Sequence, residues 1–519
     1  MPRLFHAQVN DYLLQSKVNK TFEEILWMND KAFERWIVAL SKEVIYAWDE
    51  LGMPPEKGIN DEEILRQFEG LCNLDVSRFT RRDELTYEEN CIVNNAKVGS
   101  ACNAFFPNIG KVKDIQNTDL TGNSIYDCFL DPLNTGGVVG TMRRNFKRDT
   151  YYAFSPVVVR GDTEVSLDAN TGKQWIQRFA TGRPGELQDY DFWLDPKVPK
   201  TRSKSGTPLT LSQRDLTALV KDGHVEDRHL VNAPQDGADT KSRYRIRLFK
   251  LKQRILPQGF KFFKTGFHIS ATNFPPPVAR YLYRRFTEDL KEQDQIVVYD
   301  PSAGFGGRLL GALSLGDDMQ IHYVGTDPNP DNWLSEINRS RYEYLAEFFH
   351  NNVRRRYRTT YELFTLGSEV VHRDKGFQRY KGKLDFVFTS PPYFAAEGYS
   401  EDENQSFKKF PTYAQWRDGF LRQTLATAAE YLKPDRWLVF NISDISLTGR
   451  YFPLEQDTVD ICKSLGLEYR GKLKMVLPLS PGANRVSKSS RLMTTKNFCQ
   501  IDGTARKYEP VLTFWKGGS

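Results

Sequence analysis

The 519-residue sequence lacks several features that define large classes of protein. Its six cysteines are scattered and include no Cys-x-x-Cys pair, which argues against a zinc site and a disulfide framework and favours a reducing compartment. No apolar run is long enough to cross a bilayer. The first residues, Met1 to His6, lack the apolar core of a secretory signal. We therefore expect a cytoplasmic protein with no membrane contact and no metal.

A strong excess of one charge is also missing, since the formal net charge is only +6. Such a mildly basic balance is compatible with nucleic-acid binding but does not diagnose it. Hydrophobic residues make up 39% and aromatic residues 13% of the chain, as in folded proteins rather than disordered ones. The length exceeds one typical hydrophobic core, so we expect two or three domains.

The N-terminal part, residues 1–240, is expected to form an α+β region whose fold we do not recognise. Apolar residues recur at helical spacing between residues 20 and 70. Residues 100–195 are rich in glycine, asparagine and short apolar runs, which is typical of short strands and turns. Residues 196–242 are polar, and we expect a partly exposed linker or loop there.

From about residue 255 onward, short apolar runs alternate with helical segments. The expected strands are Val297–Asp300, Tyr323–Asp327, Phe386–Phe388 and Trp437–Asn441. The expected helices are Val278–Leu290, Leu309–Leu313, Asn332–Phe349 and Tyr413–Leu432. Alternating strands and helices predict a doubly wound α/β sheet over residues 255–519.

The most informative stretch follows the apolar run that ends at Phe388, and reads Thr389, Ser390, Pro391, Pro392 and Tyr393. A buried strand that breaks into Ser-Pro-Pro predicts a rigid loop. Two prolines fix two φ angles and remove two backbone donors, so the loop presents mainly acceptor oxygens. A hydroxyl, a carbonyl acceptor and an aromatic ring on one stiff loop suit a flat heterocycle that bears an exocyclic amine. The alternative is an ordinary proline-rich turn.

A glycine-rich loop follows the strand that ends at Asp300 and contains Ser302, Ala303, Gly304 and Gly306. Glycines let the backbone approach a ligand closely, at the strand end where α/β folds bind nucleotides. The spacing departs from G-x-G-x-x-G, which weighs against a nicotinamide dinucleotide. Asp327 ends the next strand, where a carboxylate can accept hydrogen bonds from ribose hydroxyls. Its alternative role is a turn before a helix.

These motifs together resemble the amino-methylating DNA methyltransferases over about residues 259–516. The resemblance implies a Rossmann-like domain that uses S-adenosyl-L-methionine. It implies that the catalytic loop consists of Ser390, Pro391, Pro392 and Tyr393. It also implies that the cofactor contacts Asn273, Phe274, Pro275, Asp300, Ser302, Ala303, Gly304, Gly306, Asp327, Ser368 and Thr389.

Several substrates remain open within this resemblance. A Ser-Pro-Pro-Tyr loop favours N4 of cytosine, and N6 of adenine is the alternative. No cysteine follows the two prolines, which argues against methylation of carbon 5. We expect double-stranded DNA as partner, with the target base extruded, in the cytoplasm of a bacterial or phage-infected cell. An RNA or protein methyltransferase, or a nucleic-acid-binding protein that has lost catalysis, is the further alternative, and the oligomeric state stays open.

The target sequence would be read by loops or by residues 1–240. The basic stretches are Arg143–Arg148, Arg243–Lys250 and Pro478–Arg491. Basic residues interleaved with aromatic residues suit a nucleic-acid surface. A charged edge strand or a solvated loop explains the same patterns equally well.

Overall fold

The computed structural model describes residues 12–51, 61–114, 124–139, 254–256, 272–478 and 497–518, apart from a few positions within these ranges, and the strands of a small sheet between residues 151 and 212. The three basic stretches named above lie outside the described residues, except for Pro478. No helix among the described residues is long and apolar enough to cross a membrane.

The small sheet is antiparallel and centres on β4 (Tyr151–Arg160), which pairs with β5 (Thr163–Ser166), β6 (Asp191–Pro196) and β7 (Leu209–Ser212). The strand content expected for residues 100–195 is therefore confirmed here. Strand β7 corrects the prediction of a linker or loop at residues 209–212, because its apolar-polar alternation allows it to pair with β4. Residues 197–208 and 213–242 of that prediction lie outside the described residues. The helical character expected before residue 70 is confirmed in α3 (Asp30–Leu51) and α4 (Asp61–Cys72).

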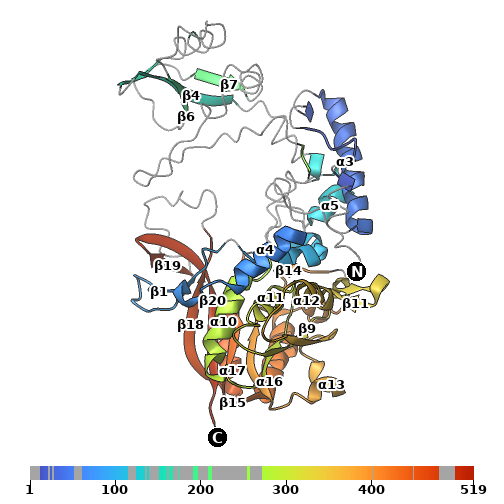
Figure 1. Ribbon diagram of the computed structural model, residues 1–519, viewed down its shortest axis with the longest axis vertical. Helices are drawn as coiled ribbons and strands as arrows, with labels where there is room; N and C mark the ends of the chain where they lie inside the picture. Colours follow the sequence, from blue (N-terminus) through green and yellow to red (C-terminus); the bar gives the residue numbers. More distant parts are fainter. Residues whose placement is uncertain are drawn as a thin grey trace.

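The large sheet has ten strands among the described residues and carries the C-terminal half of the chain (Figure 1). Five parallel strands lie side by side in the order β12 (Thr360–Phe364), β9 (Ile321–Thr326), β8 (Ile296–Asp300), β13 (Leu384–Thr389) and β15 (Leu432–Asn441). Antiparallel strand β20 (Thr504–Lys516) follows, and then β18 (Glu468–Val476). The doubly wound α/β sheet predicted from the sequence is confirmed.

Both faces of this sheet are covered, which explains why its strands read as continuous apolar runs. Along β13, Phe386 and Phe388 point into one hydrophobic core and Val387 into the other. The first core also receives α10 (Pro276–Thr287), α11 (Gly307–Leu313) and α12 (Arg341–Asn352). The second receives α16 (Arg422–Tyr431) and α17 (Leu454–Ser464). The helices of the C-terminal half are therefore divided between the two faces of the sheet.

One predicted helix begins later than expected. The segment from Asn332 was expected to be helical, but α12 begins only at Arg341. Residues Trp333–Leu334 and Arg339–Ser340 instead pair as a short hairpin. Ser340 and Glu343 then form a reciprocal capping box, which satisfies free N–H groups at the helix start and fixes its position.

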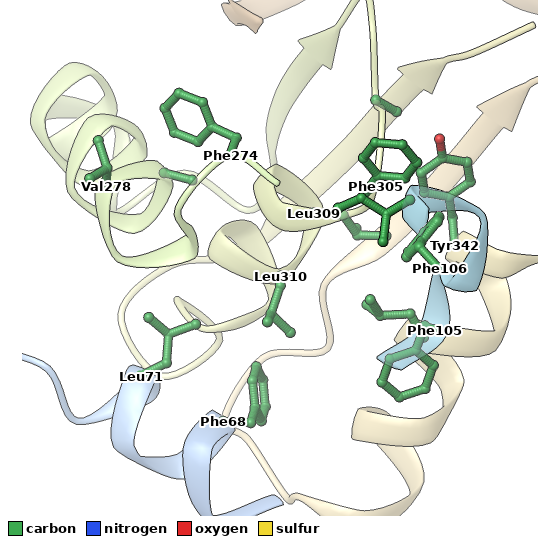
Figure 2. Close-up of a cluster of buried hydrophobic side chains, with 14 of the residues drawn as sticks. Phe68, Leu71, Phe105, Phe106, Phe274, Val278, Phe305, Leu309, Leu310 and Tyr342 are labelled. Carbon is green, nitrogen blue, oxygen red and sulfur yellow. The ribbon is translucent and has the colours of Figure 1, made fainter. Parts of the chain in front are cut away.

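The described N-terminal residues are continuous with this sheet. Strand β2 (Cys91–Val93) pairs parallel with β18, and β1 (Thr80–Arg81) pairs with β2. Helix α4 packs its buried side chains against the core of the C-terminal half, and Figure 2 shows Phe68 and Leu71 facing Leu310 and Val278. The domain boundary expected between residues 240 and 255 stays a prediction, and residues 61–114 make extensive contacts across it.

A buried ion pair fixes the turn between β1 and β2 to the sheet. Lys474 Nζ donates to the Asp83 carboxylate, and the two side chains are 7% and 1% exposed. Asp83 also accepts hydrogen bonds from the backbone N–H groups of Leu85 and Gln500. One carboxylate thus joins β18, the hairpin of β19 (Phe498–Ile501) and the N-terminal segment.

We predict that Asp83→Ala destabilises the protein by about 3 kcal/mol, because it leaves the Lys474 ammonium buried without a counter-charge. Urea unfolding measures this loss directly. Glu89→Ala, which removes an exposed carboxylate from the same turn, is the matched control and should change the free energy of unfolding by less than about 0.5 kcal/mol. Equal effects of the two substitutions would contradict the role given to the ion pair.

Candidate active site

The glycine-rich loop between β8 and α11 lies at the carboxyl end of the sheet. Gly304 and Gly306 have φ angles of 58° and 71°, which side chains rarely tolerate. A Cβ atom on Gly306 would also lie 2.6 Å from the Phe106 ring. The loop backbone therefore needs glycine at this point, and it passes directly against a residue from the N-terminal part of the chain.

The Asp300 carboxylate is fully buried at the end of β8 and accepts four hydrogen bonds. Oδ1 accepts from Thr389 Oγ1 at 2.8 Å and from the Ser302 N–H at 3.2 Å. Oδ2 accepts from Arg308 Nε at 2.7 Å and from the Tyr323 hydroxyl at 2.6 Å. Four donors occupy the lone-pair positions that a carboxylate offers. Asp300 therefore organises the loops around it and has no free acceptor for a ligand.

Thr389 connects the glycine-rich loop to the loop that follows β13. Its hydroxyl donates to Asp300 and accepts at 3.1 Å from the Ser302 N–H, and the residue is fully buried. Because β8 and β13 are neighbouring parallel strands, their carboxyl ends meet at one edge of the sheet. Chain order reverses here, since β9 lies on the other side of β8, and such a switch point is where open α/β sheets bind ligands.

The Ser-Pro-Pro-Tyr loop is held by contacts of the Tyr393 hydroxyl and by the packing of Phe394. Ser390 is partly exposed, and its hydroxyl lies within hydrogen-bonding reach of the Tyr393 phenol. The Tyr393 hydroxyl points toward Asn441, 3.4 Å from both the backbone and the side-chain oxygen. Phe394 has a φ of 50°, a strained value for a side-chain-bearing residue, and its ring is buried. Packing of the Phe394 ring therefore holds the turn.

Asp327 follows β9 beside the glycine-rich loop. Its carboxylate accepts from the Gly304 N–H at 2.8 Å and from the Asn329 N–H at 3.0 Å. Burial raises the pKa of Asp327 to about 6, although these N–H groups act in the opposite direction. The Tyr342 hydroxyl donates at 2.5 Å to the Gly304 carbonyl, so the loop is held on both sides.

The segment before α10 lies against the same loop. Asn273 Oδ1 accepts from the Gly307 N–H at 3.2 Å, and Asn273 Nδ2 donates to the Phe305 carbonyl at 2.6 Å. The Phe274 ring packs edge-on against Phe388, with centroids 5.2 Å apart. Pro275 stands at the start of α10. The structure thus brings Asn273 and Phe274, two of the expected cofactor residues, to the glycine-rich loop.

Ser368 follows β12 at the same edge of the sheet but has an internal partner. Its side chain is buried, and its hydroxyl forms a 2.8 Å hydrogen bond with the Thr424 hydroxyl on α16. The Ser368 hydroxyl is therefore already hydrogen bonded within the protein. Ala303 is also buried, with its N–H donating to the Thr326 carbonyl at 2.9 Å.

A segment that the sequence did not mark forms another wall of the site. We call residues 100–114 the strap. It contains the 3₁₀ helices η2 (Ser100–Phe105) and η3 (Pro107–Lys111) and the strand β3 (Lys113–Asp114). Figure 2 shows Phe106 of the strap beside Phe305 and Tyr342. The Phe105 ring packs instead against aromatic residues of α12. The strand β3 pairs with β14 (Glu397–Gly398), just after the Ser-Pro-Pro-Tyr loop.

Polar contacts tie the strap to both sides of the glycine-rich loop. Asn108 Nδ2 donates at 2.8 Å to Asn332 Oδ1, and Asn332 in turn donates to Tyr342. Asn103 accepts from Asn273 Nδ2 at 3.2 Å. The strap therefore spans the loops that follow β8, β9 and β13, and the N-terminal part of the chain helps to shape the site.

Three further residues of the site come from outside the predicted set. Arg308, directly after the glycines, pairs with Asp300, and an arginine at that position was the signal that sequence reasoning passed over. The Tyr399 ring lies 6.1 Å from the Phe305 ring between centroids, and its hydroxyl donates to the Glu397 carboxylate. Tyr399 and Glu397 are thus paired with each other beside the strap.

Comparison with known proteins finds solved structures with which this chain shares low sequence identity and low TM-scores. No family model matches the sequence, and no curated protein matches it. A Thermus thermophilus protein described as a putative DNA modification methylase is 20% identical over 27% of this chain and 47% of its own length, with a TM-score of 0.17. Another structure of that protein contains S-adenosyl-L-methionine. The match thus spans about half of its length.

Two other methyltransferase structures are similar at the same low level. The CurJ carbon methyltransferase is 14% identical over 51% of this chain and 60% of its own, with a TM-score of 0.28. A SAM-dependent methyltransferase of Methanosarcina mazei is 11% identical over 45% of this chain and 97% of its own length, with a TM-score of 0.25. This chain has a Rossmann-like α/β fold. The strand order of this chain supports this fold assignment. Similarities at this level support no conclusion about activity.

The raised pKa of Asp327 gives a prediction about stability. Because the folded protein binds this proton more tightly than the unfolded chain, the contribution of Asp327 to the free energy of unfolding falls as pH rises from about 4 to about 6. Asp327→Asn removes the titration. Its stability relative to the wild type should therefore rise by about 1–3 kcal/mol across this range and level off above it. Urea unfolding at pH 4, 5, 6 and 7 measures the difference.

Asp331→Asn, the same exchange on the same loop, is the control for the loss of one carboxylate. A constant difference between Asp327→Asn and the wild type over the whole pH range would show that burial does not perturb this carboxyl.

Proposed function

We propose that this chain transfers a methyl group from S-adenosyl-L-methionine to the exocyclic N4 amine of cytosine in double-stranded DNA. The proposal rests mainly on one observation, the joining of two loops at the switch point of the sheet. Thr389, which begins the Ser-Pro-Pro-Tyr loop, hydrogen bonds to Asp300 and to the Ser302 N–H of the glycine-rich loop. A donor of methyl groups held by one loop would thus face an acceptor amine held by the other.

The residues at this edge suit the proposed cofactor. Asp327 offers a carboxylate beside Gly304, where it could accept from ribose hydroxyls. Ala303 and Gly304 present backbone rather than bulky side chains, so a ligand can approach closely. Asn273, Phe274 and Pro275 would enclose the methionine part. The cofactor, once bound, supplies an electrophilic methyl group on a sulfonium centre.

The Ser-Pro-Pro-Tyr loop would position the amine. Ser390 Oγ and the Pro391 carbonyl would each accept one amine hydrogen, which favours a localised lone pair directed at the methyl group. The protein then acts by orientation and by stabilising the positive charge that develops on nitrogen. Tyr393 would stack on the extruded base, while Pro392 and the strained Phe394 keep the loop rigid.

The choice of cytosine rests on serine at the first position of the motif, and N6 of adenine is the alternative within the same mechanism. The mildly basic charge of +6 and the large N-terminal part favour a polymeric substrate, and we assign target reading to residues 1–240 and to loops. RNA and a protein amide are the other substrates that such a loop can serve.

We predict that DNA incubated with the protein and methyl-labelled S-adenosyl-L-methionine yields labelled N4-methylcytosine on digestion to nucleosides and mass spectrometry. Ser390→Ala should lower the rate by about 100-fold or more, because one acceptor of the amine is lost. Ser335→Ala, an exposed serine away from the loop, is the matched control and should keep full activity.

Labelled N6-methyladenine would keep the mechanism and overturn the choice of base. Label on RNA or protein only would overturn the substrate. No transfer to any of these acceptors, with DNA binding retained, would instead identify a binding protein without catalysis.

A further inference from the structure

Arg308 is a buried cation whose hydrogen-bonding capacity is only partly used. Its side chain is 5% exposed. Nε donates to Asp300 at 2.7 Å, and Nη2 donates to the Ser302 carbonyl. The third nitrogen, Nη1, has no partner among the described residues. A guanidinium stays charged in proteins, so the N–H groups of Nη1 need a hydrogen-bond acceptor.

Asp300 cannot supply that acceptor. Its four lone-pair positions are already used by Thr389, Ser302, Tyr323 and Arg308 Nε. Nη1 is not among the fully buried unpaired side-chain atoms of the described residues, so it lies where a ligand can reach it. The free side of the Arg308 guanidinium is therefore suited to an anionic ligand.

The guanidinium lies between the two loops of the site. It stands over the Phe274 ring, with its central carbon 5.5 Å from the ring centroid. Burial raises the pKa of the Tyr393 and Tyr399 phenols, and the nearby charge of Arg308 acts against this on both. The charge of Arg308 thus lies within electrostatic reach of Tyr393 in the Ser-Pro-Pro-Tyr loop and of Tyr399 after it.

We infer that Arg308 binds the carboxylate of the methionine part of S-adenosyl-L-methionine through Nη1. This inference rests on the proposed function. The carboxylate is the only anionic group of that cofactor, and planar guanidinium groups bind carboxylates with good geometry. Asp300 would then act through Arg308, as the residue that orients the guanidinium, and would not contact the cofactor amine itself.

The test compares the binding of two ligands by titration calorimetry, without DNA. S-adenosyl-L-methionine has the carboxylate, and decarboxylated S-adenosylmethionine lacks it. The wild type should bind the first about 10- to 100-fold more tightly, the range expected for a charge-assisted hydrogen bond. Arg308→Lys keeps a cation beside Asp300 but has no second N–H edge. It should lose most of this preference, and Arg308→Met should lose all of it.

Arg280→Lys is the matched control, because Arg280 is equally buried in the neighbouring helix α10 and pairs with Asp318. It should lower stability and leave the ratio of the two affinities unchanged.

A wild type that binds both ligands equally would overturn the inference and leave the proposed function standing. A preference retained in Arg308→Lys would also overturn it, and would limit Arg308 to supporting Asp300. A wild type that binds neither ligand would contradict the proposed function as well. If Arg308→Met does not fold, Arg308→Lys and the wild-type ratio still decide the question.

Discussion

The buried carboxylate of Asp300 is the interaction on which the rest of the site depends. It ends β8 and collects donors from β13, β9, the glycine-rich loop and α11, through Thr389, Tyr323, Ser302 and Arg308. A buried charge is tolerated only when it is paired and hydrogen bonded, so these four donors are as necessary to Asp300 as it is to them. Two loops from different strands are thereby set in a fixed relation before any ligand arrives.

The N-terminal part of the chain belongs to this arrangement. The strap at residues 100–114 packs Phe106 onto Gly306, connects Asn108 to the loop after β9, and pairs with the chain after the Ser-Pro-Pro-Tyr loop. The strand β2 extends the large sheet beyond β18. A Rossmann-like sheet therefore forms the base of the site, and a segment far away in the sequence encloses it. This packing explains why residue 306 is glycine, because a Cβ atom there would collide with the Phe106 ring.

Local patterns predicted the parts of the structure that depend on neighbouring residues. Apolar runs marked β8, β9, β13 and β15, and turn chemistry marked the glycine-rich and proline-rich loops. What the sequence did not reveal depends on contacts between distant residues. The strap meets its partners across separations of 170 residues for Asn103 with Asn273 and 224 for Asn108 with Asn332. In the same way, the internal partner of Ser368 and the saturation of Asp300 follow from tertiary packing, which periodicity cannot report.

We propose that the edge formed by β8, β9 and β13 binds an adenosyl-methionine ligand. A crystal structure of the protein with S-adenosylhomocysteine tests this most directly. We predict the ribose against Asp327, the amino-acid part beneath Asn273 and Phe274, and the sulfur facing Ser390. Density for the ligand elsewhere on the protein, or a ligand-free edge at saturating concentration, would contradict the account.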